Sequence, residues 1–270
     1  MDRAKAALAG TRFADLRWVA TTGSTNADLP VLVAERGPTA GPPAPLVLVA
    51  DHQTAGRGRL DRTWEAEPGA SLLVSIGLGG ADLPAERLTL LPAAVGAAAA
   101  DACAGTRLKW PNDLVAPGSG PDGTDLKLGG VLSELVEVEG VGPFVVVGLG
   151  VNLDAASVPA ELADVATSLD RVLGGPVDRE VLLVDLLVGL DERWLPLVEP
   201  ASADPGEFLA AYRARSATIG RRVRVDLGHS VLVGTAVDVA ADGALVLEDD
   251  QRVRRAVSLG DVVHLRPADD

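Results

Sequence analysis

The stretch Asp51–Trp64, DHQTAGRGRLDRTW, places glycines and arginines directly after an apolar run. That run, Pro45–Ala50, has the length and composition of a buried strand. Glycine lets the backbone approach a ligand closely, and successive N–H groups in such a turn form an anion-binding concavity. Arginine adds a lasting charge and a planar fork that fits phosphate or carboxylate. The stretch indicates a cradle for an anionic ligand, although a solvated basic loop would have the same composition.

The chain around this loop is acidic. Its 270 residues include 24 Lys and Arg against 38 Asp and Glu, which gives a formal net charge of −14. General binding of nucleic acid needs clustered positive charge on a basic face, so the composition argues against DNA as a partner. An acidic protein with one arginine-rich loop suggests a small anionic ligand instead.

The sequence carries no signal for a membrane or for secretion. It has no uncharged apolar run of about 18 residues, and its start, MDRAKAALAG, lacks the apolar core of a signal peptide. The single cysteine, Cys103, cannot form an internal disulfide and suits a buried position. We therefore expect a soluble cytoplasmic protein with no membrane partner.

Strand-like and helix-like segments are mixed up to about residue 215. Strands are predicted at Arg17–Thr21, Pro45–Ala50, Ala70–Leu78, Lys127–Val138 and Phe144–Val147. Helices are predicted at 1–16, after Thr25, and at Ala85–Ala104, Arg179–Leu195 and Pro205–Ala214. Pro30 should kink or delay its helix, and the Gly/Pro/Ser-rich stretch Ala116–Asp125 is predicted to be a flexible insertion.

The composition changes at about Ser216, where short strands separated by turns begin. They are predicted at Arg222–Leu227, Val231–Val239, Ala244–Glu248, Arg252–Val257 and Val262–Leu265. This pattern predicts a small β-barrel appended to the main domain. We expect a domain over 1–215 and a second one over 216–270, and no helix-turn-helix precedes the first strand.

Polar residues follow several of the predicted strands. Thr25 and Asp28 have the spacing of a helix capping box, although the hydroxyls of Thr22–Asn26 would also suit uncharged ligand groups. Pro111 should hold Trp110 extended and end its strand, which leaves Asn112 and Asp113 on a turn.

Glycines mark two further places where a ligand could lie against the backbone. Lys127 precedes the pair Gly129-Gly130, and Asn152 follows Gly148 and Gly150 at a strand end, where it could contact the edge of a base. A lone lysine is usually a solvated surface residue, so Lys127 by itself decides nothing.

Other common chemistries lack support. His52 has no nucleophile elbow beside it, Cys103 looks structural, and His229 and His264 have the positions of ordinary strand residues. Zinc spacings, a Walker A loop and a dinucleotide fingerprint are missing from the sequence.

Taken together, five blocks resemble the biotin protein ligases. They are, in order, GSTN at 23–26, QTAGRGR at 53–59 with Trp64, KWPND at 109–113, KLGG at 127–130 and GLGVN at 148–152. The blocks cover most of residues 18–153, and QTAGRGR and KWPND are distinctive. The segment after Ser216 resembles the small SH3-like domain of the same family.

The resemblance implies an α+β fold: a mixed β-sheet flanked by helices, like that of class II aminoacyl-tRNA synthetases, with a C-terminal SH3-like β-barrel. It also implies an activity that uses ATP and biotin to make biotinyl-5′-AMP, with Mg²⁺ as a cofactor. Biotin is then transferred to a lysine of a biotin carboxyl carrier domain of acyl-CoA carboxylases. Monomer and homodimer both stay open.

The same resemblance implies roles for individual residues. The catalytic set is Arg57, Arg59, Lys127 and Asp113. The biotin-binding set is Ser24, Thr25, Asn26, Gln53, Gly56, Arg57, Arg59, Lys127, Gly129 and Gly130. The set for ATP and the adenylate is Arg59, Arg62, Trp64, Lys109, Asn112 and Asn152, and no metal ligand is assigned. We also expect the loop Gly56–Trp64 to be displaced when empty and to close over ligand.

The chain departs from the family pattern at three places. Leu60 and Asp61 interrupt the basic loop, Pro30 is unexpected after GSTN, and the Ala116–Asp125 insertion is long. Three different functions also stay open. A lipoate or octanoate ligase would share the catalytic fold, and a non-catalytic carrier of biotin or adenylate would share the binding residues. A biotin-responsive repressor is the third, and the acidic charge opposes it.

Overall fold

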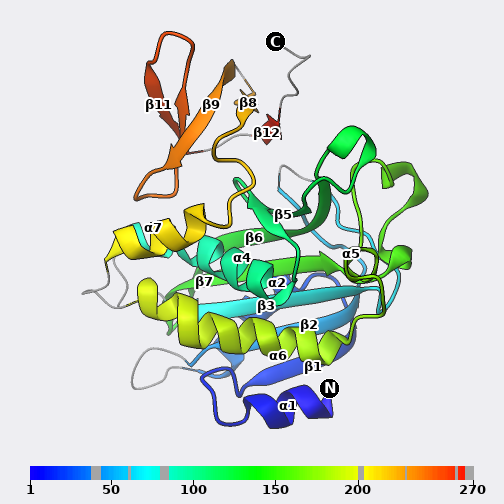
Figure 1. Cartoon of the computed structure of the whole chain (residues 1–270). Coiled ribbons are helices and arrows are strands. Elements are labelled where there is room, and N and C mark those ends of the chain that lie inside the picture. The colour runs from blue at the N-terminus through cyan, green and yellow to red at the C-terminus, as the bar shows by residue number, and fades with distance from the viewer. Residues whose placement is uncertain are drawn as a thin grey trace.

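A seven-stranded mixed sheet forms the body of the chain before residue 153, in the order β1-β2-β3-β7-β6-β5-β4. Figure 1 shows this computed structural model, which describes residues 1–37, 44–59, 62–79, 85–199, 204–228, 230–258 and 261–264. The strands are β1 (Leu16–Thr22), β2 (Leu46–Gln53), β3 (Ser71–Gly79), β4 (Arg107–Lys109), β5 (Asp113–Ala116), β6 (Leu126–Val138) and β7 (Gly142–Asn152). Only β1 and β2 pair in parallel within this sheet, because helix α2 crosses over between them.

Helices cover both faces of the sheet. They are α1 (Asp2–Leu8), α2 (Thr25–Glu35), α3 (Ala85–Leu88), α4 (Leu91–Ala102), α5 (Leu169–Leu173), α6 (Arg179–Gly189) and α7 (Pro205–Arg213). One face packs against α4 and α6, which lie in front of the sheet in Figure 1. The other packs against Leu29 and Val33 of α2. The alternation of strand side chains explains this, since Val47 of β2 joins the first core and Leu48 the second.

Several predicted helices differ from those in the structure. The helix predicted over residues 1–16 is only α1, with Ala4 and Leu8 buried. The segment Ala85–Ala104 forms two helices, because the chain turns between α3 and α4. Pro30 lies inside α2 without ending it. The helix predicted over Arg179–Leu195 corresponds to α6 as far as Gly189. It then continues as a π-helical turn, Leu190–Trp194.

The insertion Ala116–Asp125 contains a short 3₁₀ helix, Pro121–Gly123. Its last residue, Asp125, has a side chain that is only 4% exposed. This end of the insertion is therefore packed against the rest of the protein.

A second, five-stranded antiparallel sheet follows Ser216, in the order β11-β10-β9-β8-β12. Its strands are β8 (Arg222–Asp226), β9 (Val231–Val239), β10 (Leu245–Glu248), β11 (Arg254–Val257) and β12 (Asp261–His264). All five match the predicted strands within two residues at each end. Within the described ranges, no ladder joins β11 to β12, so the predicted closure into a barrel is not seen. His229 and Leu265 lie outside the described residues.

None of the helices in the described part of the chain is long and apolar enough to cross a membrane.

Candidate active site

A cavity of about 340 Å³ lies where the Gly/Arg loop meets the sheet and strand β12. Its lining combines the start of α2, the loop, the turn between β4 and β5, and the middle of β6 and β7. The polar and charged residues of the lining are Ser24, Thr25, Asn26, Gln53, Arg57, Arg59, Arg62, Thr63, Lys109, Asn112, Asp113 and Lys127. The four remaining sequence blocks thus meet the loop at one place, and the volume suits a small ligand.

The charge of the lining is opposite to that of the whole chain. Five side chains in it are cationic, namely Arg57, Arg59, Arg62, Lys109 and Lys127. Among the described lining residues, Asp113 is the only carboxylate. A chain of net charge −14 therefore concentrates positive charge at this cavity, which favours an anionic ligand.

The described ends of the loop form a tight hairpin. The N–H of Gly58 donates to the Arg62 carbonyl at 2.7 Å, and the Trp64 N–H donates to the Gly56 carbonyl at 3.0 Å. A Cβ at Gly56 would lie 2.4 Å from the Trp64 carbonyl oxygen, so only glycine fits there. Leu60 and Asp61 lie outside the described residues, and the displacement of the empty loop stays a prediction.

Two loop arginines contact groups on the sheet. Arg57 donates to Glu134 at 3.0 Å, and Arg59 donates to the Asn112 side-chain oxygen at 3.1 Å. Asn112 in turn donates to the Val131 carbonyl at 2.9 Å, so the KWPND block holds Arg59 from a fixed position. Glu134 was not predicted to belong to the site, because nothing in the sequence around it distinguishes it from a solvent-facing glutamate of a strand.

The GSTN block lies at the start of α2 and is buried there. Ser24 is the N-cap residue, whereas the capping box predicted for Thr25 and Asp28 does not form. Both the N–H and the hydroxyl of Thr25 lie within hydrogen-bond distance of the Gln53 side-chain oxygen, at 2.8 and 3.0 Å. Asp28 instead accepts a hydrogen bond from the Thr22 hydroxyl. Uncharged polar groups thus gather at the start of α2, in the part of the lining that we call the neutral end of the cavity.

Lys127 and Asp113 form a salt bridge of 2.7 Å across neighbouring strands. The register places Asp113 of β5 opposite Gly130 of β6. A Cβ at Gly130 would lie 3.5 Å from the Lys127 ammonium, so the glycine leaves that side of the ion pair open. The pair stands in the cavity wall, with both side chains partly exposed.

Glycines of β7 allow two side chains to lie flat on the sheet. A Cβ at Gly150 would be 2.9 Å from the Trp64 ring, and one at Gly148 would be 2.2 Å from the Asn26 side-chain oxygen. One face of the Trp64 indole therefore rests on the backbone of β7, and its N–H is buried without a partner among the described residues.

Three predicted site residues do not line the cavity. Gly56 shapes the loop, and Gly129 allows close strand packing, because a Cβ there would lie 2.5 Å from the Gly150 carbonyl oxygen. Asn152 is buried and donates to the Thr167 carbonyl at 3.1 Å, since the segment around Thr167 crosses over the end of the sheet. The contact between Asn152 and a base stays a prediction.

Comparison with known proteins agrees with this geometry. Residues 19–152 match the model of the biotin/lipoate A/B protein ligase family, and residues 218–265 match the biotin protein ligase C-terminal domain. The chain is 41% identical over 268 residues to the biotin–[acetyl-CoA-carboxylase] ligase of Mycobacterium tuberculosis, covering 96% of this chain and 92% of that protein. The chain belongs to the biotin protein ligase family.

Two further members of this family are similar to the chain. The bifunctional ligase/repressor BirA of Bacillus subtilis is 30% identical over 80% of this chain and 65% of its own length. The structure of a biotin protein ligase from Aquifex aeolicus in complex with biotin and ATP is 27% identical. It has a TM-score of 0.74 and covers 94% of this chain and all of that one. The mixed sheet flanked by helices and the C-terminal antiparallel sheet that the resemblance implies are confirmed, whereas the closure of the second sheet into an SH3-like barrel is not.

In this biotin protein ligase the C-terminal sheet helps to build the site. Val262 and Val263 of β12 line the cavity. The N–H of Trp110 in the KWPND block donates to the Thr218 hydroxyl at 3.0 Å, and its indole N–H donates to the Gly243 carbonyl at 2.9 Å. The C-terminal residues thereby hold the turn that carries Asn112.

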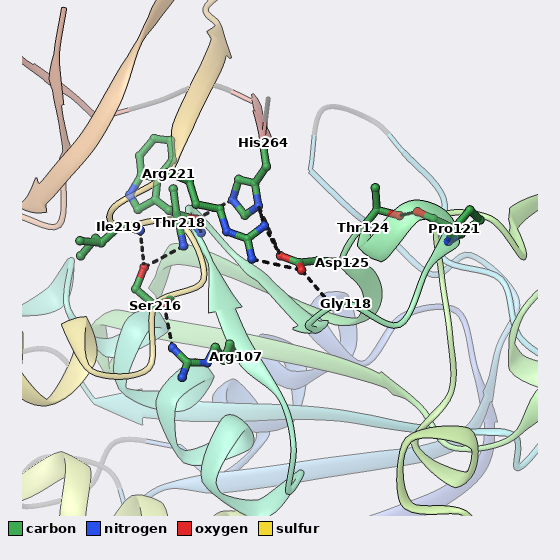
Figure 2. A network of polar contacts seen from close by, with 11 residues as sticks. Arg107, Gly118, Pro121, Thr124, Asp125, Ser216, Thr218, Ile219, Arg221 and His264 are labelled. Atoms are coloured by element: carbon green, nitrogen blue, oxygen red, sulfur yellow. Dashed lines mark hydrogen bonds and ion pairs between the residues drawn. The ribbon is translucent and has the colours of Figure 1, made fainter. Parts of the chain in front are cut away.

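A buried polar network strengthens this junction (Figure 2). Asp125, from the insertion, pairs with Arg221 at 3.0 Å and lies 3.4 Å from the Nδ1 atom of His264. The Nε2 atom of His264 is 3.1 Å from the Thr218 hydroxyl. Burial, with Lys109 and Arg221 nearby, lowers the pKa of His264 to about 4 despite the opposing charge of Asp125. His264 lies in strand β12, as predicted, and its ring also belongs to this buried network, which the sequence did not indicate.

Proposed function

We propose that the cavity described above is the active site of an ATP-dependent biotin protein ligase. The reaction makes biotinyl-5′-AMP and pyrophosphate, and biotin then passes to a lysine of a biotin carboxyl carrier domain. The observation that carries the proposal is the combination, in one cavity, of five cationic side chains with a group of uncharged hydrogen-bonding side chains around Thr25 and Gln53. Biotin has the matching polarity, with a carboxylate at one end and a neutral ureido ring at the other.

In the first step a carboxylate oxygen of biotin attacks the α-phosphorus of ATP. The bond from that phosphorus to the bridging oxygen breaks, and its electron pair leaves with pyrophosphate. Two anions must approach each other, so catalysis depends on positioning and charge neutralisation. Arg57, Arg59 and Lys127 supply positive charge where these groups meet.

The neutral end of the cavity receives the ureido ring. Ser24, Thr25 and Gln53 offer hydroxyl and amide groups without charge, and Thr25 and Gln53 hold each other in place. Such a site favours a ligand that makes directional hydrogen bonds over a purely apolar one. The biotin/lipoate family model alone does not separate the two substrates, and this polar end favours biotin over lipoate.

The nucleotide occupies the side of the cavity formed by the loop and the KWPND turn. Arg62 and Lys109 face the phosphates, Asn112 holds Arg59 toward them, and Trp64 stacks on the base with the face that is not on β7. The described part of the chain has no cluster of three or more acidic, histidine or cysteine side chains suited to a metal. Mg²⁺ would be held here chiefly by phosphate oxygens, with Asp113 as the carboxylate of the described lining available to it, and it would neutralise phosphate charge.

In the second step the amine of the acceptor lysine attacks the carbonyl carbon of biotinyl-5′-AMP. The bond from carbon to the phosphate oxygen breaks and AMP leaves, while the amine loses a proton. Asp113 is the carboxylate in the described lining that would accept this proton, and its salt bridge with Lys127 holds it in place.

The test is biotin-dependent release of pyrophosphate from ATP, run beside lipoate, followed by transfer to a purified biotin carrier domain and detection with streptavidin. We expect turnover with biotin and a labelled carrier. Replacing Arg59 with alanine should slow pyrophosphate release by about 10²-fold, as for other groups that stabilise developing charge. Arg224→Ala, an exposed arginine of β8 outside the cavity, is the matched control. Turnover with lipoate but not biotin, or none with either, would overturn the proposal.

A further inference from the structure

A continuous row of polar contacts joins the neutral end of the cavity to the loop. It runs from Thr25 through Ser75 of β3 and Asn26 to Glu134 of β6, and ends at Arg57. Ser75 is fully buried, and Thr25 and Asn26 are 4% and 6% exposed. A buried row of polar groups is stabilising only when every donor in it has an acceptor. The donor and the acceptor of each hydrogen bond in the row can therefore be assigned.

The direction is set at Glu134. Two donors converge on its Oε2 atom, Asn26 Nδ2 at 2.9 Å and Arg57 Nη2 at 3.0 Å. Asn26 Nδ2 also contacts the Leu132 carbonyl at 3.2 Å. A carboxylate and a carbonyl can only accept, so the amide nitrogen of Asn26 must face them. Its oxygen then faces Ser75 Oγ at 2.6 Å.

The remaining hydrogens follow from this orientation. Ser75 has one hydroxyl hydrogen, and it donates that hydrogen to Asn26. Ser75 therefore cannot also donate to Thr25. The single hydroxyl hydrogen of Thr25 goes to Ser75 Oγ at 2.7 Å or to the Gln53 side-chain oxygen at 3.0 Å, because both of these oxygens can only accept here. The Thr25 hydroxyl is left with a free lone pair toward the cavity, so it accepts from an N–H group of a ligand.

The backbone around the row leaves it little freedom. A Cβ at Gly148 would lie 2.2 Å from the Asn26 side-chain oxygen, so the amide fits only because this position is glycine. Gly148 lies opposite Ser75 on one side and Leu132 on the other in the strand registers. The sheet thus holds Asn26 between its two partners.

We propose that Glu134 is a positioning residue that couples the neutral end of the cavity to the loop. Its carboxylate oxygen orients Asn26, and Asn26 takes the hydrogen of Ser75, so that Ser75 does not occupy a lone pair of Thr25. The same carboxylate oxygen holds Arg57 beside the cavity. This inference rests on the proposed function, because it assigns the neutral end to a ligand with N–H donors. It adds Glu134 to that function, as a residue that affects the ligand through Asn26 and Ser75.

The test compares Glu134→Ala with Glu134→Gln. Alanine removes the acceptor, and we expect the Kd for biotin alone, measured by calorimetry, to rise about tenfold, as for the loss of one hydrogen bond to a charged group. Glutamine keeps an acceptor oxygen for Asn26 and should restore affinity to within about threefold of the original. Glu137→Ala, exposed on the opposite face of β6, is the matched control and should bind normally.

A double-mutant cycle with Arg57→Ala tests the coupling itself. If Glu134 acts through Arg57 and Asn26, replacing Glu134 should cost clearly less in the Arg57→Ala background than in the original chain. Additive losses, or unchanged affinity in Glu134→Ala with an unchanged melting temperature, would overturn the inference. If the original chain binds no biotin, the proposed function itself fails, so the two failures are distinguishable.

Discussion

Replacing His264 with glutamine should remove a defined part of the pH dependence of stability. His264 lies in β12 with its side chain 11% exposed, against the Asp125 carboxylate and the Thr218 hydroxyl. The charged groups that face it are Asp125, Arg221 and Lys109. Burial and the two cations lower its pKa from 6.5 to about 4, so the folded protein holds this imidazole neutral at a pH where the unfolded chain protonates it.

The sign and size follow from linkage. Between about pH 6.5 and about pH 4 the unfolded chain binds the extra proton, so the free energy of unfolding falls as the pH falls. At about 1.4 kcal/mol per pH unit, the full difference between the two pKa values corresponds to about 3 kcal/mol. At about pH 5 the part already lost is about 2 kcal/mol, and above about pH 7.5 it is close to zero.

The assay is urea unfolding of the original chain and His264→Gln at about pH 7.5 and about pH 5. Other groups titrate in both proteins, among them Asp178, Glu180 and Asp250. Hydrogen bonds from positively charged partners lower the pKa of each of these carboxyl groups. For each protein we therefore take the free energy of unfolding at about pH 7.5 minus that at about pH 5. These two losses are then compared. We expect the original chain to lose about 2 kcal/mol more than the variant. Equal losses would refute the reasoning from burial of His264.

Two further predictions concern the cavity. Gly148→Ala should weaken biotin binding by more than about tenfold in calorimetry, because its Cβ would lie 2.2 Å from the Asn26 side-chain oxygen. The control is Gly175→Ala, which should bind biotin normally because a Cβ there meets nothing within 4 Å. Normal binding by the Gly148 variant would contradict the close packing described above. Trypsin should cut the empty protein after the arginines of the Gly/Arg loop, and biotin with ATP should slow that cleavage. Equal cleavage rates with and without the ligands would argue against a loop that closes.

The sequence predicted the parts of the site that consist of short motifs. Apolar runs locate strands because a buried strand needs them, and the residue that follows each run then lies at a strand end. Lys127 and Asp113 were assigned to the same site from separate motifs, and the pairing of β5 with β6 brings them to 2.7 Å. The predicted bounds of Val231–Val239 match β9.

The residues that sequence analysis missed depend on pairing between distant segments. Ser75 and Glu134 are polar positions in strands, and nothing in their own neighbourhoods shows that Asn26 of α2 lies between them. Asp125 belongs to a stretch rich in glycine, proline and serine, yet Arg221 and His264 bury its carboxylate. Such contacts are set by register and packing, which a local pattern does not contain.

The carboxylates near the cavity explain how an acidic protein can hold several cations close together without ligand. Five positive side chains around one small space would repel each other strongly in a medium of reduced dielectric. Glu134 contacts Arg57, and Asp113 contacts Lys127, so each carboxylate offsets the charge of one cation. Arg59 is held by the uncharged Asn112 instead, and it keeps its full charge for an incoming anion. The arrangement fixes the positions of Arg57, Arg59 and Lys127 before binding, and Arg59 attracts an anion at the loop, where the phosphates are proposed to lie.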